Sequence, residues 1–133
     1  YSYSQGLEWA VSDGTVRDEK TAARWIEDVL RSSIASFELQ CLDALLIAAR
    51  AGDAVALRRL NDRFLAGRES AELRAESVQM GRSLVRLIRE LEETRAIAAL
   101  LSDTADPGYP CAWACAAVAF GLESGPCRQA YVW

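Results

Sequence analysis

The residues best suited to chemistry in this 133-residue chain are four cysteines, Cys41, Cys111, Cys115 and Cys127. Cys111 and Cys115 are four residues apart, so on a helix they would share one face, where two thiolates could hold a soft metal ion. No pair has the Cys-x-x-Cys spacing of a zinc knuckle. Because free cysteine is among the most buried residue types, we predict reduced, buried thiols rather than a metal centre.

Histidine is absent from the chain. Nucleophile systems of the Ser-His-Asp or Cys-His kind, and zinc, copper or nickel sites that use histidine, cannot be formed from this chain alone. The adjacent carboxylates Asp18-Glu19 and Glu92-Glu93 remain, but neighbouring helical residues point in different directions. No phosphate-binding or dinucleotide-binding glycine motif is present. We therefore expect no catalytic residues, no resident metal, no cofactor and no enzymatic activity.

The charge balance argues against a nucleic-acid partner. Fifteen basic and nineteen acidic residues give a net charge of -4, whereas nucleic-acid-binding proteins usually carry a basic surface. The longest apolar stretch, residues 111–120, is too short to cross a bilayer, and no signal peptide is visible. These features favour a cytoplasmic protein without membrane contact. Because the chain begins without Met and ends in an apolar run, we expect a piece truncated at both ends.

The elements that would position any site are helices. The sequence is rich in Ala, Leu, Arg and Glu, which favour helix, and no segment shows the alternation of a strand. Expected helix boundaries include the N-caps Asp18 and Asp53, the terminators Gly52, Gly67 and Gly121, and Pro110 in a first turn. A break is expected near Ser32, Ser33 and Ser36. We predict a single all-α domain over residues 1–133, a compact bundle of six to eight helices.

The clearest pattern lies between residues 68 and 91. Spacings of four and three residues predict a buried seam of Leu73, Ser77, Met80, Leu84, Leu87 and Leu91. Charged residues fill the other positions, and such a face is usually only solvated surface. Gly81 lies inside this helix at a cost of about 1 kcal/mol relative to Ala. We expect a neighbour to approach its backbone closely, either from this chain or from a second copy.

Several segments resemble signatures of the urease accessory protein UreF family, in the same order along the chain. Residues 1–10, Tyr-Ser-Tyr-Ser-Gln-Gly-Leu-Glu-Trp-Ala, are similar to its N-terminal Tyr-Ser-x-Gly-Leu-Glu motif. Residues 68–74, Arg-Glu-Ser-Ala-Glu-Leu-Arg, then Glu76 and residues 79–84, Gln-Met-Gly-Arg-Ser-Leu, are similar to a second signature. Looser matches are Tyr109-Pro110 before an Ala-rich helix, Phe120-Gly121, and residues 130–133, Ala-Tyr-Val-Trp.

The resemblance implies an all-helical scaffold without chemistry of its own. UreF-like proteins form homodimers and bridge UreD (also called UreH) and the UreG GTPase to apo-urease, so that nickel is inserted and the active-site lysine is carbamylated. Nucleotide hydrolysis would then belong to UreG. The family's C-terminal segment, which contributes to UreD contact and to the dimer, lies beyond Trp133. The alternative is a generic all-helical interaction or regulatory domain unrelated to urease.

The matched motifs supply the candidate partner-binding residues. Each also has a plain structural interpretation: Glu8 could be a solvated or capping carboxylate, and the tyrosines could lie at the edge of a core. The charged residues could contact partners or neighbouring helices. The full candidate set is Tyr1, Tyr3, Glu8, Arg68, Glu69, Glu72, Arg74, Glu76 and Gln79.

Overall fold

The computed structural model describes residues 6–31 and 37–132. Over these residues the chain forms eight α-helices and no strand, which confirms the all-α prediction. The chain divides into two compact units, residues 1–37 and residues 38–133. We describe each unit by itself, and the single domain expected over the whole chain stays a prediction.

The first unit holds α1 (Leu7–Ser12) and α2 (Glu19–Val29). A turn follows α1, with Gly14 at a φ of +80°. Asp18 caps α2, because its carboxylate accepts a 2.8 Å hydrogen bond from the backbone N–H of Thr21. Hydrogen bonds to the backbone and side chain of Thr21 lower the pKa of that carboxyl. The α2 helix ends at Val29, and the serines at which a break was expected lie outside the described residues.

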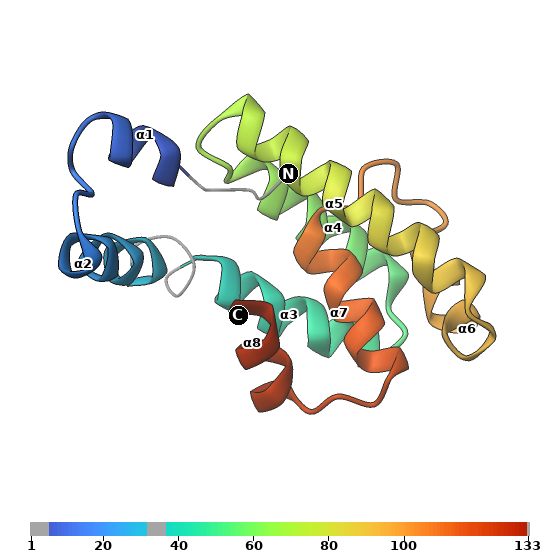
Figure 1. The fold of residues 1–133 in the computed structure, drawn as a ribbon. Coiled ribbons are helices and arrows are strands. Elements are labelled where there is room, and N and C mark those ends of the chain that lie inside the picture. Colours follow the sequence, from blue (N-terminus) through green and yellow to red (C-terminus); the bar gives the residue numbers. More distant parts are fainter. Residues whose placement is uncertain (1–5, 32–36, 133) are drawn as a thin grey trace. The chain divides into compact units, whose positions relative to one another are not determined.

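The second unit forms a helical bundle (Figure 1). Its centre is α7, which packs against α3 on one side and α5 on the other, with α4 and α6 also in contact. Two short 3-10 turns, η2 and η3, flank α6, and α8 packs on α3. The bounds are α3 (Leu39–Arg50), α4 (Ala54–Ala66), α5 (Ala71–Glu90), η2 (Glu92–Thr94), α6 (Arg95–Ala98), η3 (Ala99–Leu101), α7 (Tyr109–Ala119) and α8 (Ser124–Val132).

Helix boundaries in this unit follow the expected residues. Gly52 and Gly121 take left-handed backbone angles, both with a φ of +67°, after α3 and α7. Asp53 caps α4 by accepting a 2.9 Å hydrogen bond from the N–H of Ala56. Pro110 lies in the first turn of α7, where its missing N–H costs no hydrogen bond. These helix boundaries could therefore be predicted from the type of a single residue at each position.

The buried seam predicted on α5 is confirmed at Ser77, which is buried, but its register is wrong beyond that residue. Leu87 and Leu91 are 53% and 36% exposed, while Leu73, Met80 and Leu84 are half-buried. The buried line shifts by one residue after Ser77, where Gly81 rather than Met80 faces the backbone of Pro107 and Gly108. The fully buried residues of α5 are Ser77, Gly81, Val85 and Ile88.

Gly81 is where the chain approaches α5 most closely. A Cβ at this position would lie 2.0 Å from the carbonyl oxygen of Pro107 and 2.7 Å from the carbonyl carbon of Gly108. The close approach predicted at Gly81 is confirmed, and the neighbour is a loop of the same chain. This loop connects η3 to α7 and crosses α5 at position 81. Only glycine, which lacks a Cβ, leaves room for the loop backbone there.

Candidate functional site: the polar surface of α5 and its buried anchor

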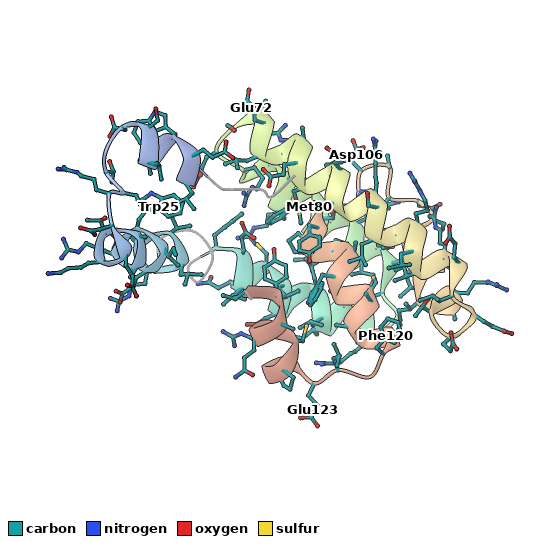
Figure 2. The ribbon with its side chains drawn as sticks, in the orientation of Figure 1. Trp25, Glu72, Met80, Asp106, Phe120 and Glu123 are labelled. Atoms are coloured by element: carbon teal, nitrogen blue, oxygen red, sulfur yellow. The ribbon has the colours of Figure 1, made fainter. Side chains whose placement is uncertain are left out.

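The candidate residues near α5 do not all face the same way. Glu69, Glu72, Arg74 and Gln79 are exposed, and Glu76 is half-buried. In the first unit Glu8 is exposed on α1. Tyr1 and Tyr3 lie outside the described residues. The exposed members are thus available to solvent or to a partner, and Figure 2 shows Glu72 pointing away from the bundle near the start of α5.

Arg68 differs from the others because its side chain is only 10% exposed. Its guanidinium donates to the carboxylate of Glu38, which is itself 7% exposed, and lies over the ring of Phe64, 5.4 Å from its centroid. The hydroxyl of Tyr131 donates a 2.6 Å hydrogen bond to the other oxygen of Glu38. Arg68 was expected among outward charges; instead it takes the second role considered for it, a contact between neighbouring helices.

This Glu38–Arg68–Tyr131 cluster joins three parts of the second unit. Glu38 immediately precedes α3, Arg68 lies in the turn between α4 and α5, and Tyr131 belongs to α8. Burial, followed by the negative charge of Glu38, raises the pKa of the Tyr131 hydroxyl. A buried ion pair of this kind is strongly destabilising to break, because one charge is left without compensation. The cluster therefore anchors the beginning of α5, where the candidate residues are concentrated.

Aromatic packing supports the same anchor. The ring of Tyr131 stacks on that of Tyr109 at a centroid distance of 5.6 Å and meets Trp113 edge-on at 6.0 Å. The indole N–H of Trp113 points at the sulfur of Cys127, 3.3 Å away. These contacts join α7 to α8, and tilted or stacked rings at such distances add to the apolar burial.

Two groups at the beginning of α5 carry shifted pKa values. The pKa of Glu72 is lowered by hydrogen bonds to its own backbone N–H and to the side chain of Ser70. Ser70 is the N-cap of α5, accepting a 3.2 Å hydrogen bond from the N–H of Leu73. Burial raises the pKa of Glu76. Glu72 thus helps the helix begin as well as presenting charge to solvent.

The loop over residues 102–108 borders the exposed face of α5. Asn61, buried on α4, holds it twice: its side-chain amide donates to the carbonyl of Asp106 at 2.9 Å, and its oxygen accepts from the N–H of Gly108 at 2.7 Å. The hydroxyl of Ser77 accepts from the N–H of Tyr109 at 3.0 Å. The carboxylate of Asp106, labelled in Figure 2, pairs with Arg82 of α5. Four contacts therefore fix this loop against α4 and α5.

A depression of about 440 Å³ lies where this loop meets α4 and the first half of α5. Its charged lining mixes both signs, with two arginines and three aspartates. It includes one candidate residue, Arg74. The charged residues that line it are Arg58, Asp62, Arg74, Asp103 and Asp106.

The cysteines are placed as predicted for buried thiols. Cys111 and Cys115 are 1% and 0% exposed on α7, and Cys127 is fully buried on α8, while Cys41 is half-buried. Burial raises the pKa of the Cys111 thiol, and that of Cys115 to about 12. Such thiols stay protonated at neutral pH, and the thiolate is the metal-binding form. Within the described residues no group of three or more histidine, cysteine or acidic side chains could hold a metal ion.

The sequence patterns missed Glu38, Asn61 and Tyr131. A signal existed for two of them. Glu38 occupies the apolar row of α3, four residues before Leu42, and Asn61 lies four residues after Leu57 on the buried face of α4. A buried polar residue without a hydrogen-bond partner lowers the stability of the fold. Both positions therefore indicated a buried partner, but the sequence did not show which residue it is.

The fold of the described residues and this surface define a class: an all-helical bundle with a rigid polar face on one long helix. Among the described helices none is long and apolar enough to span a membrane.

Comparison with known proteins gives the family. The profile of the UreF family matches residues 16–133. The urease accessory protein UreF of Dechloromonas aromatica (strain RCB) is 46% identical over 135 residues, covering 100% of this chain and 59% of its own length. UreF of Azoarcus sp. (strain BH72) is 48% identical over 136 residues, covering 100% of this chain and 58% of its own length. The chain belongs to the UreF family of urease accessory proteins, and it spans about three-fifths of the length of these relatives.

Proposed function

We propose that the protein containing this chain acts as a scaffold in urease maturation, bridging the UreG GTPase and UreD (UreH) to apo-urease during nickel insertion. The observation that carries the proposal is family membership, with 46% and 48% identity over the full chain to proteins named urease accessory protein UreF. It replaces the alternative of an unrelated helical regulatory domain, since that alternative required the likeness to be coincidental.

The proposed role is one of contact rather than chemistry. The chain has no histidine, and the pKa of the buried Cys111 and Cys115 thiols is raised, so nickel would be cargo of the assembly rather than a ligand of this chain. Nucleotide binding and hydrolysis would belong to UreG. We further propose that the protein is a cytoplasmic homodimer with no nucleic-acid or membrane partner.

The exposed candidate residues on α5 support a contact role. Glu69, Glu72, Arg74 and Gln79 are all exposed in or just before α5, whose other face is fixed to α7. Charged groups on a rigid element give specificity and speed of association. We propose that this face, together with Glu8 and the N-terminal tyrosines Tyr1 and Tyr3, contacts partners. Arg68 and Glu76 would act indirectly, by holding the beginning of α5 in place.

Co-purification tests the proposal. The full-length protein is expressed with tagged UreD and untagged UreG, and urease activation by nickel is measured in the same cells. Wild-type protein should recover both partners, while Glu72→Ala and Arg74→Ala should recover less of at least one and activate less urease, at an unchanged melting temperature. Absence of UreD and UreG from the wild-type preparation would contradict the scaffold role. If both variants recover as much UreD and UreG as the wild-type protein, this face of α5 is solvated surface and not a partner contact.

A further inference from the structure

A row of arginines follows the second half of α5, on the other side of the 102–108 loop from Arg74. Arg82, Arg86 and Arg89 are spaced four and three residues apart, so they lie on one helical face and span about 10 Å along the axis. All three line a single depression of about 420 Å³. All three are exposed, so the arginine row is open to solvent.

The floor of this depression is apolar. It includes Val85 and Leu101, which are 5% and 1% exposed, and Pro107 from the loop. Arg82 already pairs with Asp106. Arg86 and Arg89 have no ion-pair partner among the described residues, and the acidic group in the lining is Glu90. The chain as a whole carries a net charge of -4, so this groove is a local basic surface on an acidic protein.

We propose that this groove binds a short acidic segment of a partner protein, with two or three carboxylates placed around one apolar side chain. The carboxylates would pair with Arg86 and Arg89, whose planar guanidinium groups match a carboxylate in two parallel hydrogen bonds. The apolar side chain would lie against the exposed Ala105 and the edge of Val85. Arg82 would share its remaining donors, since a guanidinium carries five N–H groups.

Two features favour a peptide over other anions. A free phosphate or a nucleic-acid backbone would pair with the arginines but leave the exposed Ala105 uncovered, whereas a peptide with an apolar side chain can do both. Arginine with apolar neighbours is also the composition enriched in protein interfaces. The groove keeps its shape without a ligand, because Gly81, Asn61 and Ser77 fix the loop that forms one wall. This inference rests on the geometry of the second unit and not on the urease-related function.

The test uses the full-length protein and a fluorescent peptide, acetyl-Glu-Glu-Leu-Glu-Glu-amide, in anisotropy titrations at low salt. Wild-type protein should bind it, and the double variant Arg86→Glu/Arg89→Glu should bind about tenfold more weakly or worse, since both charge-assisted pairs become repulsions. The matched control is Arg59→Glu/Arg63→Glu, two exposed arginines of α4 outside this groove, which changes the net charge equally and should retain binding. Thermal melts should be alike for all three proteins.

Competition separates the possible ligands. The peptide acetyl-Glu-Glu-Ser-Glu-Glu-amide should bind more weakly than the leucine peptide, and inorganic triphosphate should compete poorly. The proposal is overturned if wild-type protein does not bind the acidic peptide at millimolar concentration, or if the control variant loses binding as much as the groove variant. It is also overturned if triphosphate competes as well as the peptide, because the groove would then be a general anion site.

Discussion

The helices α5 and α7 pack against each other, yet they are built differently. In α7 seven of eleven residues are buried, and they lie all around the helix. In α5 four of twenty residues are buried, in one line, and seven of the other sixteen are charged. A helix surrounded by neighbours needs no apolar stripe, because every side meets protein. A helix at the edge needs one narrow stripe and can use its other faces for contacts with partners.

Both helices have small residues among their buried positions. Ala112, Ala116 and the cysteines of α7 face neighbours with little bulk, and α5 contributes Ser77 and Gly81 to its own buried line. Small side chains shorten the distance between backbones, so the exact residue at each contact matters more than total hydrophobicity. Substitutions in α5 and in α7 should therefore differ in their effect on stability.

The largest effect is expected from Gly81→Ala. The added Cβ would lie 2.0 Å from a backbone oxygen that cannot swing away as a side chain would, so we expect a loss of about 4 kcal/mol or more, above the usual 1–3 kcal/mol of overpacking. The control is Gly125→Ala in α8, where the new Cβ meets nothing within 4 Å. Urea denaturation measures both. A Gly81→Ala protein of wild-type stability would show that the 102–108 loop does not press on α5.

The register of α5 can be tested with two neighbouring residues. Ile88 is 1% exposed and Leu87 is 53% exposed. Ile88→Ala should cost about 3 kcal/mol, within the 2–5 kcal/mol range of buried truncations, while Leu87→Ala should cost about 0.5 kcal/mol or less. Chemical denaturation of the two variants at the same pH gives the comparison. Equal losses of stability would mean that Leu87 is buried, as the sequence spacing predicted.

The buried thiol of Cys115 makes stability depend on alkaline pH. Its pKa is raised by burial to about 12, so the folded state keeps a proton that the unfolded chain loses near pH 9. Stability is therefore complete below about pH 9 and decreases as pH rises towards 12, by about 1.4 kcal/mol per unit for this thiol. Cys115→Ala should make the decrease between pH 8 and 10.5 shallower in urea titrations, and the Cys111 thiol, whose pKa burial also raises, should account for a remaining slope. Cys41→Ala, at a half-buried position, should retain most of it.

The smallest effect on stability is expected at the exposed face of α5. Arg74→Ala removes an exposed charge and should change the free energy of unfolding by no more than about 0.5 kcal/mol. A thermal melt beside wild-type protein checks this. A large loss would mean that Arg74 is a structural residue, and its proposed partner contact would have to be withdrawn.

The sequence predicted the helices well because their ends depend on single residues. Asp18, Asp53, Pro110 and Gly121 act through local geometry, which spacing and residue type reveal directly. The register of α5 was not predictable in the same way. The seam spacing placed Met80, Leu84 and Leu87 inward after Ser77, whereas the 102–108 loop, distant in sequence, packs against Gly81.

The orientation of the candidate side chains was predictable only in part, because the motifs are local. Family motifs indicated the segment 68–79, and most of its charged residues are exposed. The motifs could not show that Arg68 turns inward, because its partner Glu38 is thirty residues away along the chain and Tyr131 is farther still. Pairing across such separations depends on how helices pack, which no local spacing encodes.

Asn61 has a consequence for how this protein can change over evolutionary time. It holds the 102–108 loop by backbone atoms, at Asp106 and Gly108, on either side of the residue that lacks an N–H. The exposed loop side chains of Ser102, Asp103 and Ala105 do not take part in these hydrogen bonds. Mutations there can accumulate without altering the path of the loop, so lineages could diversify the chemistry of this surface while inheriting an unchanged frame.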